Sequence, residues 1–241
     1  MFDGTASPPQ SPLDPQIADP HGLLFRVNDP PRWIGQLKYK FEIGESSLPA
    51  TITGGSWYHM MSFADQRFST DGLSQADPGS SGEPALLRRN HGLFMVYEQL
   101  LARAAPGSDK GIAFFLRASA SPSDGNLVSA YVDGGFLFTG FSETHPNDKF
   151  GIAATYARIS DRARALDRDV QIFTGAPYPV RDYEAILEVS YQHEVRPGFL
   201  LQPVFQYIAH PAGGGVDPND PAQTHRIKDG VMVGARTTIS Y

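Results

Sequence analysis

The last thirteen residues of the chain, Asp229-Gly-Val-Met-Val-Gly-Ala-Arg-Thr-Thr-Ile-Ser-Tyr241, show an alternating pattern with two different faces. Val231, Val233, Ala235, Thr237, Ile239 and Tyr241 fall on one face, whereas Arg236 and Thr238 fall on the other. Because successive side chains of a β-strand point to opposite faces, the pattern predicts a strand with one apolar face. The stretch ends on an aromatic residue of the apolar series, and the strands of outer-membrane barrels present such a face to lipid. A transmembrane β-barrel is therefore the working hypothesis.

The composition is compatible with this hypothesis. The net charge is −6, the mean hydropathy is −0.28, and no apolar run approaches the roughly 18 residues of a spanning helix. Only every second residue of a barrel strand meets lipid, so an average over the sequence mixes the two faces. The 24 Gly and 20 Pro suit many strands joined by turns. The sequence has no Cys for a disulfide framework, and no signal peptide is visible after Met1.

The same alternation recurs along the chain between segments rich in turn-forming residues. It is clear at 33–43, where Trp33, Leu37 and Tyr39 oppose Lys38 and Lys40. At 51–63 the two faces do not separate by polarity. The patterns predict an all-β protein of about nine antiparallel strands, at 33–43, 51–63, 91–101, 111–119, 127–140, 150–159, 183–192, 199–207 and 229–241. Residues 23–27 could add a short tenth strand.

The Pro-rich residues 1–20 are predicted to be a loop or disordered, so the barrel portion covers 21–241. The connections between strands differ in length. If the C-terminus is periplasmic, short connections fall on the periplasmic side, and three of the four on the extracellular side are long, as in transmembrane barrels. The short ones are 44–50, 102–110, 141–148 and 195–198, and the opposite set is 64–89, 120–126, 160–182 and 210–228. The charged stretch 158–182 could hold a short helix or only a loop.

Several groups of residues carry a resemblance to a known family. They are Phe25-Arg-Val-Asn-Asp-Pro-Pro31, residues 122–128 with 131–135, 156–164, 175–184, 201–208 with His210 and Pro211, and 234–241. In this order they resemble the carbohydrate-selective porins of the OprB type, from Gram-negative outer membranes. The resemblance covers about residues 21–241 and looks like the C-terminal part of such a porin. It implies passive diffusion of mono- and small oligosaccharides through a barrel of about sixteen strands.

Nine or ten strands would make this chain an incomplete portion of such a barrel. Single-chain bacterial barrels normally have an even number of strands and both ends in the periplasm. We therefore expect an open, curved sheet in which the strands at 33–43 and 229–241 do not pair with each other. We also expect no sugar flux from the isolated polypeptide.

The sequence offers little support for catalysis, and we predict that the protein is not an enzyme. The seven His show no metal-ligand spacing, and the chain has no P-loop and no G-x-S-x-G motif. Glu184 and Glu188 lie on one strand face about 13 Å apart, which exceeds the carboxylate spacing of glycosidases. Neither a metal, nor another cofactor, nor a nucleic-acid partner is expected.

A channel for sugars needs wall groups that exchange hydrogen bonds with hydroxyls. Charged, amide and aromatic side chains on the polar faces are the candidates for the lumen: Lys38, Lys40, Arg117, Tyr131, Asp133, Glu184, Glu188, Gln202, Gln206 and Arg236. Four arginines could fold into the pore as a basic constriction or lie on an outer loop: Arg158, Arg162, Arg164 and Arg168. Two alternatives remain, a soluble β-rich carbohydrate-binding module and a membrane-inserted surface protein without transport.

Overall fold

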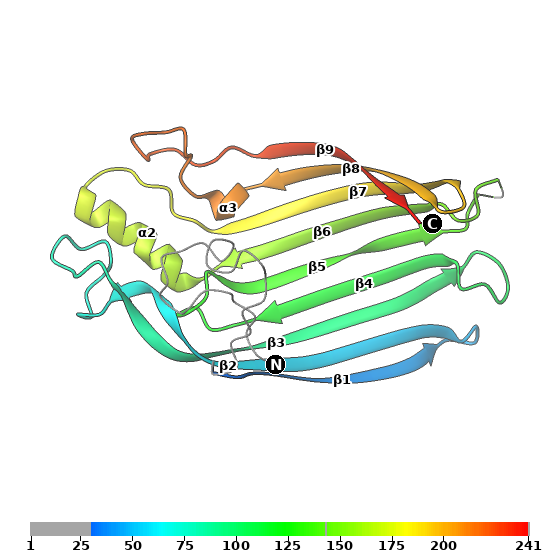
Figure 1. The fold of residues 1–241 in the computed structure, drawn as a ribbon, viewed down its shortest axis with the longest axis horizontal. Helices are drawn as coiled ribbons and strands as arrows, with labels where there is room; N and C mark the ends of the chain where they lie inside the picture. Colours follow the sequence, from blue (N-terminus) through cyan, green and yellow to red (C-terminus); the bar gives the residue numbers. More distant parts are fainter. Residues whose placement is uncertain (1–29, 143, 241) are drawn as a thin grey trace.

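The computed structural model describes residues 30–142 and 144–240. They form one curved antiparallel sheet of nine strands, in which each strand pairs with its neighbours in sequence (Figure 1). The strands are β1 (Arg32–Ile43), β2 (Leu48–Ser69), β3 (Pro84–Arg103), β4 (Gly111–Ala120), β5 (Val128–Thr139), β6 (Lys149–Ile159), β7 (Tyr183–Arg196), β8 (Phe199–Ala209) and β9 (Gly230–Ile239). Two helices, α2 (Asp161–Thr174) and the short α3 (Pro211–Gly214), lie in connections.

All nine expected strands are confirmed, but the expected loop at 64–89 is wrong over much of its length. β2 continues to Ser69 and β3 begins at Pro84, because Ala64 pairs with Leu86 and, after a shift in register, Ser69 pairs with Pro84. Only 70–83 connect the two strands. The expected loop or disordered segment at 1–20 and the short strand at 23–27 lie outside the described residues.

The charged stretch after β6 forms a helix. The Ser160 side chain caps its start by accepting a hydrogen bond from the N–H of Ala163 at 3.3 Å. Gly175 ends the helix in the left-handed conformation, with φ of 66°, which glycine adopts without steric cost. No helix within residues 30–142 and 144–240 is long and apolar enough to cross a membrane.

The sheet is open, as expected. Among the described residues β1 pairs only with β2, β9 pairs only with β8, and no ladder joins β1 to β9. The connections are sorted by length, also as expected: the four at the end of α2 include every long one, and the four at the other end are short (Figure 1). The membrane side on which each end lies remains a prediction.

The pairing register gives the sheet two chemically different faces, because directly opposite residues of an antiparallel ladder share a face. One row runs through apolar residues on six successive strands: Phe114, Phe136, Ile152, Val189, Phe205 and Val233. We call the face that carries this row the apolar face, and the opposite one the polar face. The rings of Phe114 and Phe136 lie 5.3 Å apart, yet Phe136 keeps 41% of its surface exposed.

The chain has almost no conventional core. In the described part of the chain, the buried apolar residues are Ala50, Leu100, Ile159 and Ala163. Large apolar side chains stay exposed along the apolar face, including Leu37, Leu187 and Val233. An exposed apolar surface of this extent marks an interaction site, either for another protein or for a membrane.

The register also fixes the phase of β2, which its sequence left open. Thr51, Thr53, Gly55 and Trp57 lie on the polar face, since they oppose Glu98, Val96, Phe94 and Gly92. Two aromatic rings there lie over glycines. A Cβ atom at Gly92 would sit 2.5 Å from Nε1 of Trp57, and one at Gly55 would sit 2.4 Å from the Phe94 ring. These glycines leave room for the rings to lie flat along the wall.

Candidate functional site

An ion pair stands near the centre of the polar face. Arg117 on β4 and Asp133 on β5 are directly opposite in the register. The Arg117 Nε donates to both carboxylate oxygens at 3.0 Å, and its Nη2 makes a further hydrogen bond to Oδ2. The Asp133 side chain is 5% exposed, whereas that of Arg117 is 55% exposed. The carboxylate therefore holds the guanidinium in place, and the guanidinium faces the open space.

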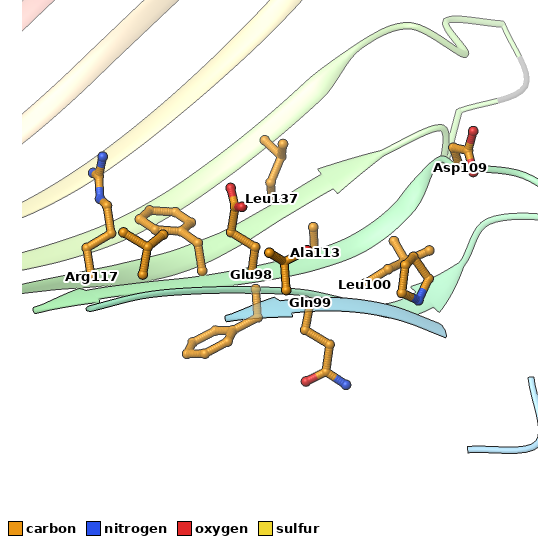
Figure 2. A pocket seen from close by; sticks show the side chains of 12 residues that line it. Glu98, Gln99, Leu100, Asp109, Ala113, Arg117 and Leu137 are labelled. Atoms are coloured by element: carbon orange, nitrogen blue, oxygen red, sulfur yellow. The ribbon is translucent and has the colours of Figure 1, made fainter. Parts of the chain in front are cut away.

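A hollow of about 530 Å³ lies beside this pair (Figure 2). Its lining includes Thr51, Glu98, Phe115 and Arg117, and the Arg117 guanidinium carbon lies 5.3 Å from the centre of the Phe115 ring. In Figure 2, Glu98, Arg117 and Leu137 project to the same side of the sheet, and Gln99 projects to the other.

The chemistry of this hollow suits a polyol. An aromatic ring offers an apolar surface to the C–H groups of a sugar ring, while a guanidinium and a carboxylate supply hydrogen-bond donors and acceptors for its hydroxyls. The Glu98 side chain makes no hydrogen bond within residues 30–142 and 144–240 and is exposed, so its carboxylate is available to a solute.

The other candidates on strands fall on the same face, with one exception. Glu188 accepts a hydrogen bond from Gln206 Nε2 at 2.5 Å, and Gln202 lies opposite Arg236. Glu184 accepts the backbone N–H of Ala212 at 2.7 Å. The register also places on the polar face Lys38, Lys40 and Tyr131, opposite Thr53, Thr51 and Ser119 respectively.

The exception is Arg158. It lies opposite Ala130 and Tyr183, which belong to the apolar series, and its Nη2 donates to Asp161 at 2.8 Å. Arg158 therefore lies on the apolar side at the end of β6, just before α2. The sequence left open whether this residue enters the pore or lies on an outer loop.

The helix α2 is fixed to β2 by two crossed ion pairs. Arg162 of α2 donates to Asp65 of β2 at 3.2 Å, and Arg67 of β2 donates to Asp169 of α2 at 2.7 Å. Ser74 Oγ also donates to Asp169, at 2.6 Å. The two guanidinium carbons lie 5.0 and 4.8 Å from the Phe68 ring, so that Phe68 is held between the two arginines.

This contact places α2 at the polar side of the sheet end. The rings of His59 and Phe63 pack against each other at 5.2 Å, and Asp65 continues the same alternating series on β2. Since α2 follows β6 and reaches β2 across three intervening strands, it spans the end of the curved sheet (Figure 1). Arg162 is held there, Arg164 pairs with Asp161 at 3.4 Å, and Arg168 is exposed.

The two carboxylates of the crossed ion pairs are nearly buried, with side-chain exposures of 4% for Asp65 and 9% for Asp169. Burial raises the pKa of Asp169, but hydrogen bonds from Arg67 and Ser74 outweigh it, and the pKa is lowered overall. A second anchor involves Asp182, which accepts hydrogen bonds from His210 at 2.8 Å and from Arg226 at 3.2 Å. The Asp182 carboxylate thus links the β6–β7 connection to the β8–β9 connection.

The reasoning from sequence missed Glu98, Phe115 and Trp57 on the polar face. Trp57 lies in the strand whose phase was not assigned, and Phe115 is an apolar residue in the polar series of β4. The alternation within β4 already places Phe115 on the face of Arg117, but its apolar side chain gave no reason to select it. The faces of Glu98 and Trp57 follow only from the register with neighbouring strands. Asp65 and Asp169 were missed because their partners are about a hundred residues away, at separations of 97 and 102.

Comparisons with known proteins agree with this geometry. The family described as "Carbohydrate-selective porin, OprB family" matches residues 1–241. A solved structure described as the high pH structure of Pseudomonas putida OprB matches with a TM-score of 0.77 at 18% sequence identity. The match covers 93% of this chain and 52% of that one, so this chain spans about half the length of the solved porin. No curated protein sequence matches the chain.

Proposed function

The chain belongs to the carbohydrate-selective porins of the OprB family, and from this we propose that its nine strands form part of the wall of an outer-membrane channel for sugars. Mono- and small oligosaccharides diffuse through the channel along the polar face, and the apolar face contacts lipid. The location is the outer membrane of a Gram-negative bacterium.

The observation that supports this function best is the continuity of the two faces. The apolar row crosses six strands without a break, and Arg117, Asp133, Glu188 and Gln206 lie on the other face. A soluble carbohydrate-binding module would have to expose the whole apolar face to water, which costs about 25 cal/mol for each Å².

The proposed route for the solute uses the hollow beside Arg117. Glu98 and Arg117 exchange hydrogen bonds with sugar hydroxyls, and the Phe115 ring contacts the apolar side of the sugar. Single contacts of about 1 kcal/mol are strong enough to favour entry and weak enough to allow exit. The helix α2, held by the crossed ion pairs, narrows the channel at the end with the long connections.

The function is tested in a chimera in which residues 30–240 replace the matching strands of the solved porin, so that flux is measured through a closed barrel. Liposomes with the chimera are expected to swell in isotonic glucose, whereas the 241-residue chain alone gives no swelling. A surface protein without transport would give a folded, inserted chimera without swelling, and this outcome would overturn the proposal.

The polar hollow is tested in the same chimera by a single substitution. Glu98→Ala is expected to weaken the affinity for glucose about fivefold, the value of one hydrogen bond of about 1 kcal/mol. The affinity is measured from the decrease of ion conductance as glucose is added. Arg196→Gln is the matched control, because Arg196 is an exposed residue at the short-turn end of β7. Equal effects of the two substitutions would show that Glu98 does not bind the sugar.

A further inference from the structure

Two adjacent arginines near the start of β3, Arg88 and Arg89, take no part in the contacts described so far. Both are exposed, and within residues 30–142 and 144–240 neither side chain makes a hydrogen bond or an ion pair. β3 begins to pair with β4 only at Leu93, opposite Ala120. The two arginines therefore lie beyond the end of β4, at the end of the sheet with the long connections (Figure 1).

An irregularity in the strand sets their direction. The register shifts between the pairs His59–Asn90 and Ser62–Arg88, and Arg89 has φ of 73°, a conformation that is uncommon for a residue with a side chain. A Cβ atom at Gly125 would lie 3.7 Å from both Leu87 and Asn90, so these two residues face the β4–β5 connection on the polar side. Arg88 directly follows Leu87 in the strand, so its side chain points to the opposite side of the sheet, which is the apolar side.

Toward these arginines, the residues on the apolar face change from aliphatic to aromatic. Leu93 is 65% exposed, and the next residue of the same series, His91, lies opposite Tyr58, which in turn lies opposite Trp33. Aromatic side chains at this height and cations beyond them are the arrangement that proteins present to the lipid interface and the headgroups. A cleft of about 380 Å³ is lined by Tyr58, Arg88, Arg89 and His91, and also by Asp124.

We propose that Arg88 and Arg89 bind the phosphate group of an anionic lipid headgroup at the outer rim of the sheet. The planar set of N–H donors on a guanidinium matches the oxygens of a phosphate group. The two positive charges of Arg88 and Arg89 exceed the single negative charge of Asp124, whose carboxylate accepts the N–H of Gly125 at 2.8 Å. Tyr58 supplies a further hydroxyl donor. The inference rests on the proposed function, because that function places the apolar face in lipid.

The test measures binding of lipid A, a phosphorylated glycolipid, to the full chain folded in detergent micelles. The double substitution Arg88→Gln with Arg89→Gln is expected to weaken binding about tenfold, since it removes several charge-assisted hydrogen bonds. Arg196→Gln, at the opposite end of the sheet, is expected to leave the affinity unchanged. Circular dichroism of each variant confirms that the sheet is folded.

The outcomes separate the possible explanations. Equal affinity in the double variant and the parent chain would overturn the proposal. Full competition by millimolar inorganic phosphate would also overturn it, because the site would then be one for free anions rather than for a lipid. Flotation of the parent chain with phosphatidylcholine vesicles is measured separately: failure to float contradicts the proposed function, whereas flotation without an effect of the double substitution contradicts only the lipid site.

Discussion

Replacing Phe136 by arginine is expected to lower the free energy of unfolding from a lipid bilayer by about 2–4 kcal/mol, the cost of a cation on the lipid side of a barrel strand near the midplane. Phe136 lies in the apolar row, opposite Phe114 and Ile152, eight residues after the start of β5 and three before its end. Urea unfolding of the chain refolded in phosphatidylcholine vesicles measures the change.

Ser190→Arg is the matched control on the polar face. Ser190 lies on β7 opposite Gly151 and Val204, and its side chain faces the side that also carries Glu188. We expect this arginine to change the free energy of unfolding by about 0.5 kcal/mol or less, as at most surface positions. Equal losses at Phe136 and Ser190 would show that the two faces do not differ in solvent.

Replacing Asp65 by alanine is expected to release α2 from β2. Asp65 accepts the N–H groups of Arg67 at 2.8 Å and of Phe68 at 3.0 Å as well as the Arg162 guanidinium. Each buried donor that loses its partner costs about 1–3 kcal/mol, and breaking a buried ion pair costs about 3–5 kcal/mol. Backbone amides of α2 should therefore exchange with solvent at least about a hundredfold faster.

Asp161→Ala is the control for this release. Asp161 pairs with Arg158 and Arg164 three residues away on either side, and its side chain is 67% exposed. Exposed pairs of this kind contribute about 1 kcal/mol or less. Similar exchange rates in the two variants would mean that the crossed ion pairs do not hold the helix.

Acid should weaken the same contact. The folded pKa of Asp169 is lowered, so its ionised form stabilises the folded state at pH values above the unfolded pKa of about 4. This stabilisation is lost as the pH falls through the lowered folded value. We expect α2 to exchange faster only below about pH 4, and acceleration between pH 7 and 5 would not fit this carboxylate.

The strands could be predicted from the sequence because each one carries its own alternation, and β9 shows it over its whole length. The extent of β2 and β3 could not, since residues 64–69 show no clear alternation and their strand is extended by pairing of Ala64 and Ser69 with β3. The side on which Arg158 lies was left open, because a charged residue at this point could belong to the strand or to the connection after it; pairing with Ala130 and Tyr183 places it on the apolar side.

The site was predictable in part. Arg117 and Asp133 could be identified because they are charged residues within alternating strands, and the register brings them into contact. The hollow beside them also includes Phe115, which shares the face of Arg117 by alternation but was not selected because its side chain is apolar. The crossed ion pairs depend on the path of the chain from β6 back to β2, which no local pattern contains.

The central claim, that one face of the sheet contacts lipid and the other contacts water, is tested most directly by the two tryptophans of the chain. The register places Trp33 on the apolar face opposite Tyr58, and Trp57 on the polar face opposite Gly92. Fluorescence is measured in vesicles on the single-tryptophan variants Trp57→Phe, which keeps Trp33, and Trp33→Phe, which keeps Trp57. We predict that brominated lipid quenches mainly Trp33 and that aqueous iodide quenches mainly Trp57; equal quenching of both residues, or the reverse preference, would contradict the claim.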